Sequence, residues 1–175
     1  AYFLPLQQMK LISLSTFHQN KIRNNYGIET TIIPWGLYEN STIISEEKTI
    51  DIIGVGSLIP LKKYSEFVAC INELKKVLPN IKSVIIGEGK LHTELKQQIQ
   101  SLQLENHIEL KGALSYHDTQ RHISKAKILL HPSIYESFGM VFAEALSLQT
   151  AIVSRNVGFA EGTEHWFLGN NPEDF

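Results

Sequence analysis

Short apolar runs alternate with amphipathic stretches along most of the chain, from residue 49 to residue 154. The runs are residues 49–55, 82–86, 107–110, 127–131 and 150–154, and each is short enough to be a buried strand. Strands that alternate with helices are typical of β–α–β units, which build a parallel sheet covered by helices on both faces. The pattern therefore predicts an α/β sandwich with a mainly parallel sheet.

The stretches between the runs carry apolar residues at spacings of three and four, as one face of a helix does. One such face extends from Phe67 to Leu78 and ends at Pro79, and a second extends from Leu95 to Leu102. Residues 118–126 follow the same spacing less regularly. Residues 139–148 are apolar almost all the way round, which is typical of a buried helix.

The first 48 residues have a different pattern. A strand-like run at residues 11–14 is followed by a polar helix near 16–25, a second β run at 30–33 and then Pro34-Trp35-Gly36. We interpret residues 1–48 as the end of a preceding domain or a linker segment, and residues 49–175 as the main domain. Because the sequence starts without Met and stops without a terminal helix, we expect a fragment of a larger protein.

The charge balance limits the possible partners. With 16 Lys and Arg against 18 Asp and Glu, the 175 residues carry a net charge of −2. Nucleic acids and anionic membranes are bound by clustered Lys and Arg, so we expect no nucleic-acid partner, and any bound anion must be met by local charge. Cys70 is the only cysteine, which favours a reducing, cytoplasmic compartment. No uncharged stretch approaches the ~18 apolar residues of a transmembrane segment.

Ligands of an open parallel sheet bind at the carboxyl ends of its strands. The loops at 56–63, 87–90, 112–117 and 132–139 are therefore the ones expected to line a crevice. Two glutamates belong to the last of these loops and to the helix that follows it. They are Glu136 and Glu144.

Glu144 is the only charged residue from Ser137 to Ser154. An ionised carboxylate on a buried helix costs several kcal/mol unless it is hydrogen-bonded or paired. One interpretation is a functional carboxylate that faces the crevice. The other is a structural one, satisfied by a backbone amide or by Lys62 or Arg155.

Glu136 lies just before the same helix, and eight residues at ~1.5 Å rise put about 12 Å between the two carboxylates. Between them the backbone amides of residues 138–140 begin the helix, where free N–H groups and the positive dipole end favour a phosphate. Gly139 allows a ligand to approach this backbone closely. The chain thus carries, in this order, a carboxylate, a group of amides that can bind an anion, and a second carboxylate.

The loop at residues 54–63 places Ser57 and Lys62 near the expected crevice. It is not a dinucleotide fingerprint, because Ile59 stands where G-x-G-x-x-G needs a small residue. Lys62 could meet a diphosphate, or with Lys63 it could simply keep a helix start in solvent.

Metal ligands and other catalytic groups are not indicated. The seven histidines have no metal-binding spacing, and we expect no metal site. His131 is interpreted as a satisfied core or rim histidine rather than a catalytic base. The backbone at residues 112–114 could bond a base or form an ordinary turn.

Residues 132–145 resemble P-S-x-x-E-x-F-G-x-x-x-x-E-A, the E-x7-E signature of the group 1 (family 4) retaining glycosyltransferases of the GT-B fold. Residues 56–62 are similar to that family's G-R-L-x-x-x-K loop, and residues 84–89 to its I-x-G-x-G turn. Residues 157–161 are similar to its G-G-x-x-E, and residues 34–36 to its interdomain P-N-G. The resemblance covers about residues 51–175, and its E-x7-E block is the specific part.

This resemblance implies a C-terminal, Rossmann-like domain of a two-domain glycosyltransferase that binds a nucleoside-diphosphate sugar. Glu136 and Lys62 would be the catalytic residues. Glu136 would contact the sugar hydroxyls, Lys62 the diphosphate and Glu144 the ribose, while residues near Leu114 would meet the base through the backbone. The full donor-binding set would be Ser57, Lys62, Leu114, Glu136, Ser137, Phe138, Gly139, Met140 and Glu144.

The same resemblance implies that the sugar is transferred with retention to an acceptor held by an N-terminal domain. That domain is the expected partner, and without it we expect weak donor binding and no transfer. The donor is a substrate, so no separate cofactor and no metal are expected. Location in the cytoplasm, with peripheral membrane contact of the full enzyme, is compatible with these expectations.

Two positions depart from the family pattern. Ser57 stands where the family has Arg, and Lys63 where it usually has Gly. Loss of the arginine removes a bidentate phosphate ligand, which is expected to change donor affinity or phosphate geometry. Two alternatives therefore stay open: a sugar-nucleotide epimerase or phosphorylase-like GT-B enzyme, and a non-catalytic interaction domain with a degenerate site.

Overall fold

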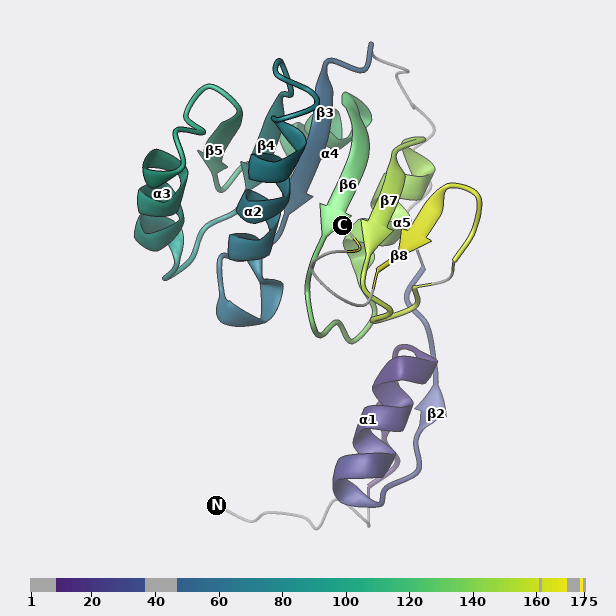
Figure 1. The fold of residues 1–175 in the computed structure, drawn as a ribbon. Helices are drawn as coiled ribbons and strands as arrows, with labels where there is room; N and C mark the ends of the chain where they lie inside the picture. Colours follow the sequence, from purple (N-terminus) through teal and green to yellow (C-terminus); the bar gives the residue numbers. More distant parts are fainter. Residues whose placement is uncertain (1–8, 37–46, 161, 170–173, 175) are drawn as a thin grey trace.

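A six-stranded parallel sheet forms the centre of the computed structural model, which describes residues 9–36, 47–160, 162–169 and 174. Each neighbouring pair of strands is parallel. The spatial order is β5 (Ile108–Gly112), β4 (Ser83–Ile86), β3 (Ile50–Val55), β6 (Ala126–His131), β7 (Ala151–Ser154) and β8 (Trp166–Leu168) (Figure 1). The expected α/β fold with a parallel sheet is confirmed.

The first five strands lie where the apolar runs predict them, but the sixth, β8, was not predicted. It has three residues, too few to show a period in the sequence. Its register is fixed by pairing with β7 and by Trp166, which is buried and donates a hydrogen bond from Nε1 to Ser154 Oγ at 2.8 Å. Residues 166–168 therefore form a strand because of contacts with a distant part of the chain, and no local sequence pattern predicts it.

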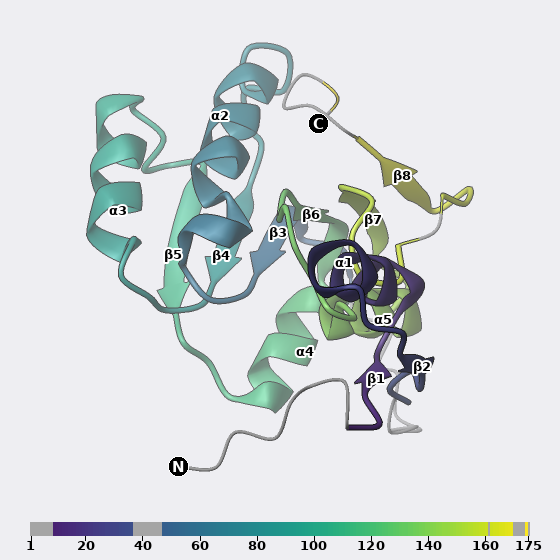
Figure 2. The ribbon, with the colours of Figure 1, turned by 90° about the horizontal axis from the view of Figure 1, so that it is seen from below.

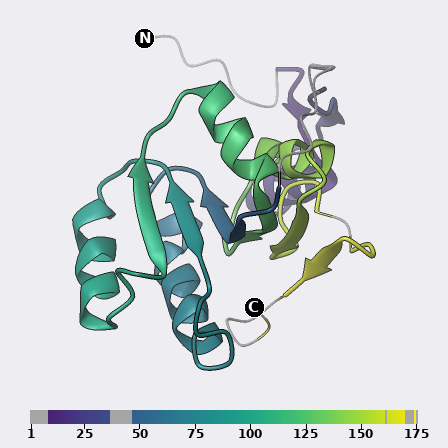
Figure 3. The ribbon, with the colours of Figure 1, turned by 90° about the horizontal axis from the view of Figure 1, so that it is seen from above.

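Helices cover both faces of the sheet, as Figures 1 and 3 show. Successive residues of β3 point to opposite faces, so Ile52 and Ile53 belong to different core clusters. Ile52 packs with α2 (Tyr64–Leu74) and α3 (His92–Ser101). Ile53 packs with α4 (Tyr116–Ser124) and α5 (Met140–Ser147). The sheet is therefore buried on two sides, which explains its continuous apolar runs.

The apolar face expected up to Leu78 ends earlier. Helix α2 stops at Leu74, and the side chains of Val77 and Leu78 are 74% and 52% exposed. Proline disfavours the helical conformation of the residue before it, so the chain leaves the helix in turns ahead of Pro79.

The expectation that the helix at 139–148 is buried on every side is wrong. In α5 only Phe142 and Ala145 are buried, and Leu146 is 41% exposed. Met140 and Val141 line a cavity, and Val141 is only partly buried where it packs against the core. One side of this apolar helix thus packs in the core, and another side forms part of the cavity wall.

Residues 9–36 form a small unit with β1 (Ile12–Ser13), α1 (Thr16–Tyr26) and β2 (Thr31–Ile32). The two strands pair in parallel, and the unit lies beyond the carboxyl end of the sheet, where Figure 2 shows α1 over α5. The order of strand, helix and strand agrees with the prediction. The boundary expected after residue 48 follows residues 37–46, which lie outside the described part of the chain.

The strand order reverses between β3 and β6. From β3 the chain proceeds to β4 and β5 on one side, and from β6 it proceeds to β7 and β8 on the other. Two loops that leave in opposite directions open a crevice at this point, outside the carboxyl ends of the strands. The loops after β3 and β6 are therefore brought together.

Candidate functional site

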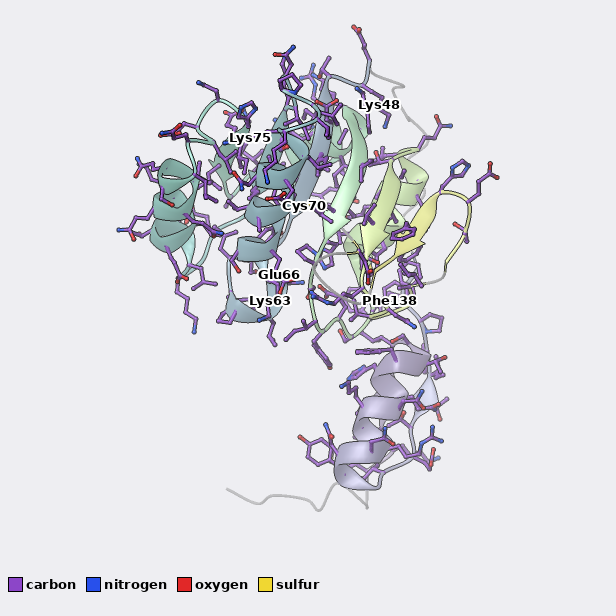
Figure 4. All side chains as sticks on the ribbon, viewed as in Figure 1. Lys48, Lys63, Glu66, Cys70, Lys75 and Phe138 are labelled. Atoms are coloured by element: carbon purple, nitrogen blue, oxygen red, sulfur yellow. The ribbon has the colours of Figure 1, made fainter. Side chains whose placement is uncertain are left out.

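A cavity of about 370 Å³ lies at the strand reversal. The loops after β3 and β6 and the start of α5 form most of its wall, and the N-terminal unit contributes the rest. Figure 4 shows Lys63, Glu66 and Phe138 at this end of the sheet, while Lys48 lies at the opposite end. The lining residues are Leu14, Trp35, Val55, Gly56, Lys62, Glu136, Ser137, Phe138, Gly139, Met140, Val141 and Glu144.

Most of the site residues inferred from the sequence meet in this cavity. They are Lys62, Glu136, Ser137, Phe138, Gly139, Met140 and Glu144. Ser57 and Leu114 do not line it: Ser57 is exposed in its loop, and Leu114 packs partly buried against the core cluster around α4 and α5. The roles given to all nine stay predictions.

Glu136 is the most connected side chain of the site. Its Oε1 pairs with Lys62 Nζ, and His131 Nε2 lies 2.7 Å from the same oxygen. The side chains of Lys62, Glu136 and His131 are 19%, 14% and 2% exposed. The carboxylate is thus held between a lysine on the cavity side and a histidine on the interior side.

The charges of this group follow from its burial and contacts. Burial raises the pKa of Glu136, but the contacts with His131 and with the Lys62 ammonium outweigh it, and the net pKa is lowered. Burial lowers the pKa of His131, and the contact with Glu136 only partly offsets it. At neutral pH we therefore assign a carboxylate to Glu136 and a neutral imidazole to His131.

Glu144 has the opposite shift. Burial raises its pKa, and the nearby side-chain amide of Gln120 on α4 offsets this only in part. The expectation that Lys62 or Arg155 partners this carboxylate is wrong, because Lys62 pairs with Glu136 and Arg155 with Glu66 at 2.8 Å. Glu144 lines the cavity, and within the described part of the chain it forms no ion pair with a lysine or arginine.

Helix α5 begins at the cavity because of Gly139, its N-cap. This residue has φ = 92°, a backbone conformation that residues with a side chain rarely adopt. A Cβ there would lie 2.5 Å from Cδ2 of Phe142. Glycine is thus required both by the backbone and by the ring packed beneath it. Gly139, Met140 and Val141 all line the cavity, so the helix starts at the cavity wall, and Phe142 N–H already donates to the Gly139 carbonyl at 2.9 Å.

The loop that carries Glu136 is braced from behind. Phe159 N–H donates to the Phe138 carbonyl at 2.9 Å, and their rings lie 4.5 Å apart. A Cβ on Gly158, at φ = 64°, would lie 2.0 Å from the same carbonyl oxygen. Arg155 also donates to the Pro132 carbonyl. Glu161, the end of the motif at residues 157–161, lies outside the described residues.

Three residues at the site were not anticipated from the sequence. Leu14 and Trp35 come from the N-terminal unit, and nothing local marks them as cavity walls. His131 was noticed only as a structural histidine, yet it contacts Glu136. Its placement at the end of a strand run and five residues before the first glutamate was the available signal.

Comparison with known families agrees with this geometry. Residues 39–165 match the model of the family described as "Glycosyl transferases group 1". The chain belongs to this family.

Curated relatives of this group 1 member are glycosyltransferases. The phosphatidylinositol N-acetylglucosaminyltransferase gpi3 subunit of Schizosaccharomyces pombe is 28% identical over 109 residues, which are 62% of this chain and 24% of that protein. The O-antigen chain mannosyltransferase RfbU of Salmonella typhimurium is 25% identical over 170 residues, 94% of this chain and 47% of RfbU. The chain thus spans from a quarter to about half of the length of these relatives.

Solved structures show that the group 1 member has the expected fold. TarM of S. aureus superposes with a TM-score of 0.82 at 20% identity, over 94% of this chain and 35% of TarM. HepE of Anabaena superposes with a TM-score of 0.75 at 21% identity, over 91% of this chain and 49% of HepE. The fold is that of the C-terminal half of a GT-B glycosyltransferase, as the resemblance implies.

The described residues contain neither a membrane-spanning helix nor a metal-binding cluster. Among them, no helix has both the length and the apolar character that crossing a membrane requires. Within the same ranges, no group of three or more His, Cys, Asp or Glu side chains is arranged to hold a metal ion.

Proposed function

We propose that this chain is the donor-binding part of a retaining glycosyltransferase that uses a nucleoside-diphosphate sugar. The observation that carries the proposal is the position of Glu136 and Glu144 on either side of the α5 N-terminus, in one cavity with Lys62. A sugar nucleotide presents hydroxyls, then two phosphates, then ribose hydroxyls. The cavity presents acceptors and anion-binding groups in a matching order.

Each group has a defined task in this proposal. Glu136, an ionised carboxylate, accepts hydrogen bonds from sugar hydroxyls, and Glu144 accepts them from the ribose. Lys62 and the first amides of α5 stabilise the diphosphate as the sugar–phosphate bond breaks, so no metal is needed to balance its charge. The acceptor oxygen bonds to the sugar on the face from which the diphosphate departs, and the hydroxyl proton passes to the departing diphosphate, which gives retention.

Relatives support a sugar-nucleotide donor. HepE has been solved in complex with UDP-glucose, and TarM in complex with UDP. We extend only the class of ligand to this chain, a nucleoside diphosphate and its sugar. Ser57 in place of arginine leaves Lys62 as the side-chain cation of the cavity wall in the described part of the chain, so we expect weaker phosphate binding than arginine would give.

The rest of the enzyme is proposed from the same resemblance. Residues 1–48 would be the end of an N-terminal domain and the interdomain segment, which agrees with Leu14 and Trp35 in the cavity wall. That domain would hold the acceptor and complete the cleft. The enzyme would act in the cytoplasm, with any membrane contact peripheral.

The first test is calorimetric titration of the full-length protein with UDP, GDP and ADP and with UDP-glucose, GDP-mannose and ADP-glucose. We expect one nucleotide series to bind, and Glu144→Ala to weaken it about tenfold, because a hydrogen bond to a charged group is worth ~1.5–3 kcal/mol. The control is Glu105→Ala, at an exposed position in the turn before β5.

Two results would contradict the proposal: no binding of any nucleoside diphosphate, or binding that Glu144→Ala leaves unchanged. Retention is tested separately, by NMR assignment of the anomeric configuration in the product of the full-length enzyme. A product whose anomeric configuration is inverted relative to the donor would refute the retaining mechanism and leave the binding site standing.

A further inference from the structure

The interior contact of Glu136 is the feature that the proposed function does not use. His131, the last residue of β6, is 1% exposed and does not line the cavity. Its ring stands edge-on to Phe142, with centroids 5.0 Å apart at 85°, so the ring plane is fixed by packing. Its Nε2 lies 2.7 Å from Glu136 Oε1.

The proton of this contact belongs to the histidine. Burial keeps the imidazole neutral and Glu136 is a carboxylate, so Nε2–H donates to Oε1. Because the carboxylate can only accept, the contact also fixes the tautomer of the ring.

Both partners of Glu136 use the same oxygen. Lys62 Nζ and His131 Nε2 each contact Oε1. Among the residues that the structure describes, no hydrogen bond reaches Oε2. Because Glu136 lines the cavity, its second oxygen is left to accept a hydrogen bond from a ligand.

Lys62 cannot be the permanent partner of this carboxylate if a diphosphate also uses it. When phosphate oxygens take part of its charge, Glu136 loses compensation in a half-buried position, where burial raises the carboxyl pKa. The contact from His131 stays, because the imidazole lies on the opposite side from the cavity.

We infer that His131 is a positioning residue, which holds Glu136 in place and in its ionised form while Lys62 moves from Glu136 to the diphosphate of the donor. This inference rests on the proposed function. His131 does not touch the ligand, so it acts only through Glu136.

The other titratable groups around Glu136 do not take over this task. Tyr64, on α2, is buried, and burial and the charge of Glu136 raise its pKa, so it stays neutral. Its hydroxyl has no hydrogen-bond partner among the described residues. Arg155 contacts the Pro132 carbonyl and is paired with Glu66. Within the described part of the chain, only Lys62 and His131 contact the carboxylate.

The test compares His131→Phe, which keeps a ring but removes the donor, with His131→Gln, whose amide can donate to Oε1. Calorimetry on the full-length protein measures the affinity for the nucleoside diphosphate and for its sugar derivative at pH 7.5 and pH 5.5. We expect His131→Phe to weaken the sugar nucleotide about tenfold and the nucleoside diphosphate less than about twofold. The loss should grow at pH 5.5, because Glu136 then protonates more readily.

His131→Gln should restore most of the affinity. His107→Phe is the control, because that histidine contacts the Ile81 carbonyl at the start of another strand. Should His131→Phe fail to fold, ¹⁵N spectra of the wild-type imidazole replace it, and we expect a neutral ring with a protonated Nε2 at pH 7.5.

Several outcomes overturn the inference alone: equal affinities in His131→Phe and wild type, a loss independent of pH, an equal loss in His131→Gln, or an imidazole that is already protonated, or protonated on Nδ1 instead of Nε2, at pH 7.5. A wild-type protein that binds no sugar nucleotide overturns the proposed function itself. The two failures are therefore distinguishable.

Discussion

The two glutamates of the E-x7-E pair differ in how the protein treats their charge. Contacts with His131 and Lys62 outweigh burial and lower the pKa of Glu136. Burial raises the pKa of Glu144, and Gln120 offsets it only in part. One carboxylate is stabilised by its contacts in the protein, while the other forms no ion pair with a cation in the described part of the chain. A buried carboxylate of this kind lowers the stability of the folded protein but is available to bind a ligand.

This difference predicts a pH-dependent effect of Glu144→Gln. A carboxyl whose pKa is raised on folding binds its proton more tightly in the folded state. Its contribution to the free energy of unfolding is therefore full below the ordinary pKa of 4.5, and it is lost as the pH rises through the folded-state pKa. We expect Glu144→Gln to raise the thermal unfolding midpoint at pH 7 relative to wild type, and more than it does at pH 4. Differential scanning calorimetry at both pH values measures this.

The matched control is Glu105→Gln, at an exposed position, which should change the midpoint equally little at both pH values. If Glu144→Gln destabilises the protein at pH 7, the carboxylate has a stabilising partner and is not poised for a ligand.

At the scale of elements, one junction adopts a conformation that its residue does not favour. Lys63, the N-cap of α2, has φ = 54° and ψ = 37°, in the left-handed region. This is the position where Lys63 replaces the glycine usual in the family. A side chain there costs about 1–2 kcal/mol. The structure therefore gives a physical reason for the glycine.

We predict that Lys63→Gly stabilises the protein by about 0.5–1 kcal/mol, because glycine relieves the left-handed strain but has more conformational entropy to lose. Chemical denaturation measures the free energy of unfolding. Lys96→Gly is the control: this exposed lysine lies inside α3, where glycine should cost about 1 kcal/mol. Equal losses for the two substitutions would mean that the junction is not strained.

At the scale of the whole molecule, the N-terminal unit is attached to the loop that carries Glu136. Ser15 Oγ donates to the Ser137 carbonyl at 2.7 Å and also accepts from His18 N–H, which caps α1. The rings of Phe17 and Tyr135 lie 6.0 Å apart. These contacts join α1 directly to the loop that carries Glu136.

We expect Ser15→Ala to destabilise the protein by about 2 kcal/mol, from the lost cap and from the Ser137 carbonyl left without its donor. Hydrogen exchange should also become faster in α1. Ser115→Ala is matched, because Ser115 caps α4 in the same way but is exposed, and it should cost about 1 kcal/mol. Equal effects of the two variants would show that the Ser15–Ser137 contact adds nothing.

Local patterns were enough for much of the fold. The runs that became β3, β4, β5, β6 and β7 are continuous because both faces of the sheet are covered, and periodicity detects such runs. The two failures have different causes, one local and one long-range. Helix α2 ends before Pro79, and β8 is too short to show a period, so only its pairing with β7 defines it.

The sequence by itself determined the α/β architecture, the family and the two glutamates, because strand period, helix period and motif spacing are properties of neighbouring residues. Only the tertiary structure decided the partners of these glutamates. It paired Lys62 with Glu136 and gave Arg155 to Glu66 instead of Glu144. It also placed His131 behind Glu136 and brought Trp35 to the cavity. The physical reason is that ion pairing and side-chain burial depend on which loops lie close together at the carboxyl ends of β3 and β6. The order of the strands in the sheet decides which loops these are.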